Sequence, residues 1–202
     1  MANNTKTSKK DIMGMMRLAF ILFAIAAVVA LLLSAVNEIT KGPIKQQKEA
    51  AVYQAMSQVV PAESYEKIDI SNIEGLDKTV LEFYAARNGA DDIGYCVKTA
   101  PLGFGGPIEV ITGIDLEGKV THVHIVSMAE TAGLGTKAKE PDFLAQYSGK
   151  GIDVAVTTGS NPKENEISAI SGATVSSKAV TAGVAAAIST VNLVVNTTKE
   201  VA

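Results

Sequence analysis

The sequence contains few of the residues whose side chains form metal and redox sites in proteins. Its 202 residues include one cysteine, two histidines and no tryptophan. The single cysteine, Cys96, excludes an intramolecular disulfide, and it excludes a thiolate metal cage or iron–sulfur cluster made by this chain alone. Because Cys96 lies in an apolar stretch with the pattern of a strand, we expect a buried and unreactive thiol.

Positive charge is also scarce. The chain has 18 Lys and Arg against 21 Asp and Glu, a net charge of -3 at pH 7, and no basic stripe. Nucleic acid is therefore not an expected partner, because binding to its phosphates needs clustered cations.

The histidines and one glycine-rich stretch do not form a complete metal or nucleotide motif. His122 and His124 alternate along a predicted strand and share one face of it, but no third ligand is apparent. We therefore expect exposed strand histidines and no metal site. The glycine-rich residues 103–107 lack the strand–turn–helix setting of a dinucleotide fingerprint, which argues against NAD binding.

Apolar residues are concentrated in one run, 18–36, which has no charge and one hydroxyl. As a helix it would be roughly 28 Å long, close to the thickness of the hydrocarbon core of a bilayer. A cleavable signal peptide usually has a shorter core, so an uncleaved anchor is favoured. Four Lys and Arg and one acid precede the run, which favours a cytoplasmic N-terminus with the remaining chain on the outer face.

The composition predicts a tethered domain. Lys41-Gly42-Pro43 is typical of a helix break, after which a helix is predicted over 44–60, ended by Pro61. The expected parts are an N-terminal tail (1–17), a transmembrane helix (18–36), a stalk helix with a connector (37–78) and a folded domain (79–202).

The folded domain is predicted to be α+β, with helices packed on an antiparallel sheet. Turns are expected at Asn88-Gly89 and Glu117-Gly118, and a nearly uncharged final helix from Thr174 or Ser176 to about Val195 should be buried. The predicted strands are 79–87, 93–99, 108–116, 120–128 and 153–157, and a short helix is predicted over 141–147.

The stretch before the final helix, residues 171–176 (SGATVS), has two interpretations. Ser and Thr are common helix caps and Gly allows a sharp entry turn, so Thr174 is read either as a plain helix start or as part of a phosphate site. A helix N-terminus with small flanking residues presents free amides and a positive dipole end to a phosphate. The stretch is not a P-loop, because that pattern of Gly and Lys is missing.

These residues resemble the FMN-binding domain family, in which the motif Ser/Asp-Gly-Ala-Thr-x-Ser/Thr carries FMN as a phosphoester made by a flavin transferase. Residues 130–135 (ETAGLG) resemble that family's Glu-Thr-Pro-Gly-Leu-Gly loop, with Ala132 as the departure. The order of these motifs behind one anchor is similar to that of RnfG in Rnf complexes and of the related NqrC in sodium-pumping NADH:quinone oxidoreductases.

The resemblance implies one covalent FMN per chain, attached to Thr174, within an FMN-binding domain over 79–202. Glu130 would hydrogen-bond either to the flavin or to its own loop, Lys137 would lie either near the ring or in solvent, and Phe104 would flank the flavin. Ser171 and Ser176 are expected to donate to the phosphate. The implied cofactor-binding residues are Ser171, Gly172, Ala173, Thr174, Val175, Ser176, Glu130, Thr131, Gly133, Leu134, Gly135, Thr136 and Lys137, with no catalytic residue and no metal ligand.

The implied function is electron transfer in an Rnf-type ferredoxin:NAD oxidoreductase of the cell membrane that moves Na+ or H+. Its partners would be the other Rnf subunits (A, B, C, D and E), a flavin transferase and membrane lipid. Two alternatives stay open: a non-redox anchor that assembles a membrane complex, and a stand-alone extracytoplasmic flavoprotein reductase. An enzymatic activity would then belong to the assembly, in which this chain is a carrier.

Overall fold

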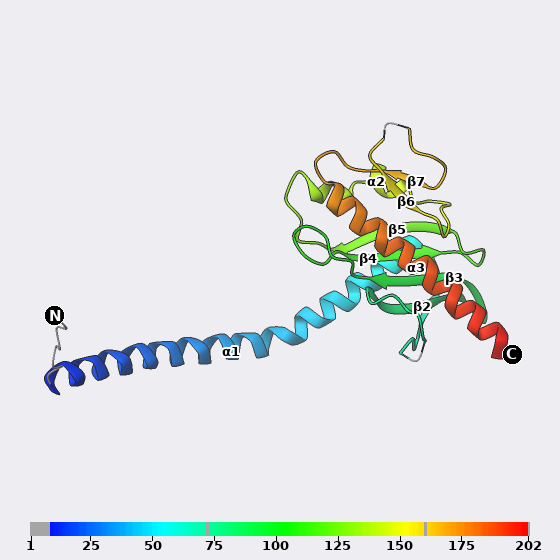
Figure 1. Ribbon diagram of the computed structural model, residues 1–202. Helices are drawn as coiled ribbons and strands as arrows, with labels where there is room; N and C mark the ends of the chain where they lie inside the picture. Colours follow the sequence, from blue (N-terminus) through cyan, green and yellow to red (C-terminus); the bar gives the residue numbers. More distant parts are fainter. Residues whose placement is uncertain (1–8, 72, 160, 202) are drawn as a thin grey trace. The chain divides into compact units, whose positions relative to one another are not determined.

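The computed structural model describes residues 9–71, 73–159 and 161–201, with side chains from residue 12 to residue 195 (Figure 1). Part of the predicted tail, residues 1–8, lies outside the described residues. The chain forms two compact units, Met1–Glu49 and Ala50–Ala202.

The first unit consists of the larger part of one helix, α1 (Lys9–Val59). The segment Ile12–Val59 is long and apolar enough to cross a membrane, and none of its most apolar window is buried by protein. Side chains such as Phe20 and Leu31 are therefore without protein cover. Such a surface suits a lipid environment.

The predicted break at Lys41-Gly42-Pro43 is wrong, because α1 continues through Pro43. A proline inside a helix removes one hydrogen bond and costs about 3 kcal/mol. Helix formation is cooperative, and the segment that follows Pro43 is rich in Lys, Gln, Glu and Ala, which are strong helix formers. The helix ends at Val59 before Pro61, as predicted.

The second unit begins with the last turns of α1, which pack on a sheet. Val52, Ala55, Met56 and Val59 are buried against one face of that sheet together with Ala86, Cys96 and Ile111 of its strands. The carbonyl of Val59 accepts a hydrogen bond of 2.6 Å from the hydroxyl of Thr121. The end of α1 is therefore part of the folded domain.

The sheet is an antiparallel meander in the order β1-β2-β3-β4-β5 (Figure 1). Its strands are β1 (Ser64–Ile68), β2 (Val80–Asn88), β3 (Asp91–Thr99), β4 (Glu109–Ile114) and β5 (Val120–Ser127). Four of these strands and both turns were predicted, and Gly89 and Gly118 have the positive φ of 62° and 81° that those tight turns require. The predicted α+β class is confirmed.

Strand β1 was not predicted. It lies in the polar connector and pairs antiparallel with β2, with Ser64 opposite Arg87. Cross-strand ion pairs join Glu66 to Arg87 and Lys67 to Glu82. Four of its five residues are polar or charged, so its sequence lacks the apolar alternation that marks a strand.

The last helix, α3 (Thr174–Val201), covers the face of the sheet opposite the last turns of α1 (Figure 1). Val180, Val184 and Ile188 are buried against Phe83 and Val97, which alternate along their strands with residues that face α1. Although α3 is apolar enough to cross a membrane, 61% of its most apolar window is buried inside the domain. It is therefore the core helix that was predicted.

Short elements connect the sheet to α3. They are the 3-10 helix η1 (Gly135–Lys139), α2 (Pro141–Ala145), β6 (Ala155–Thr157) and β7 (Glu166–Ser168). The short helix and β6 were predicted, whereas η1 and the parallel pairing of β7 with β6 were not. These elements bring the loop after β5 back toward the start of α3.

Candidate functional site

A cavity of about 390 Å³ lies where the start of α3 meets the loop after β5 and the glycine-rich loop before β4. Its volume is within the range of small-molecule and cofactor sites. It brings together all but four of the predicted cofactor-binding residues. The lining residues are Phe104, Glu130, Thr131, Leu134, Gly135, Gly172, Ala173, Thr174, Val175 and Ser176.

Thr174 is the first residue of α3, and its hydroxyl makes no hydrogen bond with any described residue. The capping interpretation therefore does not fit Thr174. Instead, the buried hydroxyl of Ser177 accepts the amide hydrogen of Ile170 at 3.0 Å and donates to the carbonyl of Ala173 at 3.0 Å. Because Ser177 secures the turn, the side chain of Thr174 remains free in the wall of the cavity.

The first turn of α3 also presents free amide groups. The amide of Ala173 donates to Ile170, and that of Ser177 donates to Ala173. Among the described residues no acceptor serves the amides of Thr174, Val175 and Ser176. Three unpaired N–H groups at the positive end of a long helix form a favourable place for a phosphate. Gly172, with a φ of 77°, makes the sharp turn into the helix.

Glu130 is a buried carboxylate in the same wall, 8% exposed. One carboxylate oxygen, Oε1, accepts the amide hydrogen of Gly105 at 3.0 Å, and the other, Oε2, accepts the hydroxyl hydrogen of Ser176 at 2.7 Å. Glu130 thus joins its own loop to the glycine-rich loop before β4 and to the first turn of α3. Its hydrogen bonds go to these neighbouring segments, and Ser176, expected to donate to a phosphate, donates to Glu130.

Glycines make the room that this carboxylate occupies. A Cβ atom at Gly103 would lie 2.2 Å from Oε1 of Glu130, and one at Gly135 would lie 2.6 Å from Oε2 and 2.7 Å from the hydroxyl of Ser176. No real Cβ atom lies at such distances. Gly103 and Gly135 are therefore needed for the packing of Glu130.

Four predicted cofactor-binding residues do not line the cavity: Gly133, Thr136, Lys137 and Ser171. The hydroxyl of Thr136 accepts the amide hydrogen of Gly133 at 2.9 Å, which shapes the loop after β5. Ser171 and Lys137 are exposed and line no part of the cavity. Thr136 and Gly133 are therefore placed to support the loop.

Apolar side chains form the rim of the cavity. Phe104, Leu134 and Val175 line it and are 75%, 45% and 52% exposed. Exposed apolar groups around a polar pocket are typical of a ligand site. Phe104 lies at this rim, and its contact with a flavin stays a prediction. Nothing in the sequence indicated the amide of Gly105 or the hydroxyl of Ser177 as part of the site.

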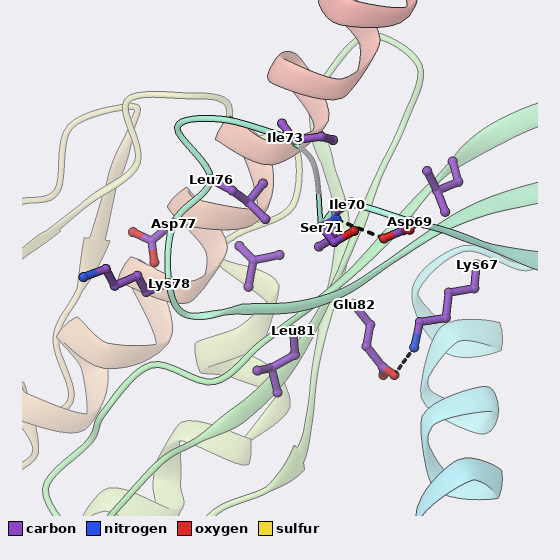
Figure 2. Close-up of a pocket in the computed structure, with 12 residues that line it drawn as sticks. Lys67, Asp69, Ile70, Ser71, Ile73, Leu76, Asp77, Lys78, Leu81 and Glu82 are labelled. Carbon is purple, nitrogen blue, oxygen red and sulfur yellow. Dashed lines mark hydrogen bonds and ion pairs between the residues drawn. The ribbon is translucent and has the colours of Figure 1, made fainter.

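Two other cavities lack this combination of groups. One of about 650 Å³ lies between β1, its connection to β2 and β2 itself, where Ile70, Ile73 and Leu76 face an opening edged by charged residues (Figure 2). The second, of about 510 Å³, contains His122 and His124. Burial and the charge of Lys139 lower the pKa of His124.

Neither the cysteine nor the acidic residues add a metal site in the described part of the chain. Within residues 9–71, 73–159 and 161–201, no three or more His, Cys, Asp and Glu gather as metal ligands would. Cys96 is fully buried, as predicted, and burial raises the pKa of its thiol to about 12. The thiol is therefore protonated and unreactive at neutral pH.

The chain is similar to known proteins along most of its length. Residues 103–189 match the family model of the FMN-binding domain, and residues 12–59 match that of the RnfG N-terminal region. Over 181 residues it is 36% identical to the G subunit of the Na+-translocating ferredoxin:NAD+ oxidoreductase complex of Acetobacterium woodii, covering 83% of this chain and 87% of that protein.

Two further similarities are weaker. Over 160 residues the chain is 32% identical to the G subunit of the proton-translocating ferredoxin:NAD+ oxidoreductase complex of Clostridium ljungdahlii, covering 78% of this chain and 81% of that protein. The crystal structure of Shewanella oneidensis NqrC aligns with a TM-score of 0.45 and 16% identity, over 52% of this chain and 53% of that chain.

Proposed function

This chain belongs to the RnfG family of ferredoxin:NAD+ oxidoreductase complexes, and from that membership we propose that it is the membrane-anchored electron-transfer subunit that carries FMN in such a complex. The observation that supports this most directly is the free hydroxyl of Thr174 beside three free amides in the wall of a cavity of cofactor size.

The finer proposal is that one FMN per chain is attached covalently to Thr174. Its hydroxyl oxygen would bond to the phosphorus of an activated flavin nucleotide while the bond from that phosphorus to the donor's leaving group breaks. A flavin transferase would carry out this exchange and take up the hydroxyl proton. A phosphoester retains the cofactor on the outer side of a membrane, where a dissociated flavin would be diluted. The free amides and positive end of α3 are suited to the charge that remains on the phosphate.

In this proposal the chain's own residues bind and orient the FMN and shield its ring from water. The amides of Thr174, Val175 and Ser176 would hold phosphate oxygens, while Phe104 and Leu134 at the rim would keep water from a flat ring. When bound, FMN supplies transfer of one electron at a time, which suits exchange with iron–sulfur centres and other flavins. No side chain here has to act as an acid or base on a substrate.

The membrane arrangement is also part of the proposal. The residues 18–36 would span the cell membrane, with residues 1–17 in the cytoplasm, residues 37–78 as stalk and connector, and the FMN-binding domain, 79–202, outside it. Partners would be the other Rnf subunits (A, B, C, D and E), and the complex would move Na+ or H+, since the named relatives include both kinds.

The attachment is tested by fluorescence in a denaturing gel. The full chain is co-expressed with a flavin transferase, alongside Thr174→Ala and a matched control, Thr131→Ala, which removes another hydroxyl from the same cavity. The wild type and the control should fluoresce, and Thr174→Ala should not. Fluorescence that persists in Thr174→Ala would place the bond on a different residue.

Assembly is tested separately by purification of the tagged chain from membranes of cells that contain the other subunits. Recovery of polytopic Rnf subunits with the chain is expected. If the chain is recovered alone while it retains its flavin, it is a stand-alone flavoprotein. Recovery of the subunits without a flavin would instead indicate an assembly anchor.

A further inference from the structure

Glu130 is a buried carboxylate that has no cationic partner among the described residues. Every ion pair of this part of the chain lies elsewhere, and the oxygens of Glu130 are bonded only to the amide of Gly105 and the hydroxyl of Ser176. An ionised carboxylate that is removed from water without a cation is costly. A buried carboxylate in the wall of a cavity of cofactor size is a candidate for a functional role.

The surroundings of Glu130 stabilise a charge without cancelling it. Both bonding groups donate hydrogen, so each oxygen of the carboxylate accepts one hydrogen bond from the protein. Ser176 lies in the first turn of α3, so the positive helix end is also close to the carboxylate. In the described part of the chain no cation pairs with the carboxylate at this place in the cavity wall.

We propose that Glu130 is an electrostatic tuning residue that lowers the reduction potential of the flavin held in this cavity. The inference rests on the proposed function and goes beyond it, because it assigns a role to a residue that need not touch the phosphate. An electron added to a flavin is a negative charge, and a carboxylate in the wall of the same partly enclosed site opposes it. The flavin would therefore give up its electrons more readily.

The test compares flavin potentials in the full chain, loaded with covalent FMN and held in detergent, by spectroelectrochemical titration. Glu130→Gln removes the charge and keeps the size of the side chain and an oxygen for the Gly105 amide. Glu130→Asp keeps the charge but is too short to reach both donors. The matched control is Glu140→Gln, which removes an equal charge from an exposed position outside the cavity.

In Glu130→Gln we expect the ratio of reduced to oxidised flavin at a fixed potential to rise tenfold or more. For a two-electron couple this corresponds to a rise of about 30 mV in the reduction potential of the flavin. Glu130→Asp and Glu140→Gln should stay within threefold of the wild type. A flavin-loaded Glu130→Gln with the wild-type potential would overturn the inference and leave the proposed function intact. So would a tenfold shift in Glu130→Asp, because geometry and not charge would then set the potential.

A wild-type chain that carries no flavin after co-expression with the transferase would overturn the proposed function, and this inference with it. In-gel fluorescence of each variant, recorded before the titration, separates loss of attachment from a change in potential. The two failures are thus distinguished in the same set of samples.

Discussion

Replacing Ser176 by alanine should destabilise the domain although it removes a single oxygen atom. The side chain is 2% exposed, and its hydroxyl donates to Oε2 of Glu130 at 2.7 Å. Without that donor, Oε2 is a buried charged acceptor with no hydrogen-bond partner in the described structure. Hydrogen bonds to charged groups contribute about 1.5–3 kcal/mol, and we take about 2 kcal/mol as the expected loss.

The assay is urea unfolding of the full chain in detergent, followed by tyrosine fluorescence because the chain has no tryptophan. With a slope of about 2 kcal/mol per molar urea, a loss of about 2 kcal/mol lowers the midpoint by about 1 M. The matched control is Ser171→Ala in the same motif, since Ser171 is exposed and its hydroxyl makes no hydrogen bond with the described residues. Its effect should stay within about 0.5 kcal/mol.

A double-mutant cycle isolates the contact itself. In a Glu130→Gln background the hydroxyl of Ser176 faces a neutral amide, so its removal should cost about 1 kcal/mol and the coupling energy should also be about 1 kcal/mol. If Ser176→Ala changes stability no more than Ser171→Ala, the contact between Ser176 and Glu130 does not hold the loop after β5 to the first turn of α3. Our account of the cavity wall would then be refuted.

Three further predictions concern the sheet and its helix. The buried hydroxyl of Thr112 has no partner among the described residues, so Thr112→Val should raise the free energy of unfolding by about 1 kcal/mol in the same urea assay; a loss would show that the hydroxyl is bonded. A Cβ at Gly183 would lie 2.9 Å from Cγ of Pro101, so Gly183→Ala should lower the melting temperature despite the better helix propensity of alanine, and a higher one would contradict the packing. Burial and the charge of Lys139 lower the pKa of His124, so the unfolded chain takes up a proton before the folded chain as the pH falls through about 6.5, and the free energy of unfolding should fall there. His124→Gln should remove that part of the pH dependence, and an unchanged dependence of stability on pH would contradict this.

The central strands and the final helix were predictable because their signals are local. β-Branched and aromatic residues, bounded by the turn signals Asn88-Gly89 and Glu117-Gly118, predict strands joined by tight turns from the local sequence. Strand β1 has no such alternation and is held by its pairing with β2, which a local pattern does not reveal. Likewise, the continuation of α1 through Pro43 depends on the whole helix and not on one residue.

The candidate site was predictable in its members but not in its contacts. Resemblance to a family pointed to both motifs, and the fold brings most of their residues to one cavity. Glu130 was left open between flavin and loop, because its bond to Ser176 joins residues 46 positions apart in the sequence. The role of Ser177 was equally hidden, since a serine inside a helix gives no sign that its hydroxyl closes the preceding turn.

The most direct test of the central claim is the intact mass of the purified full chain after co-expression with a flavin transferase, followed by peptide mapping. The account predicts a gain equal to one FMN less one water, located on the peptide that contains Thr174, and no gain in Thr174→Ala. An unmodified wild-type mass, or a flavin mapped to any other peptide, would contradict it.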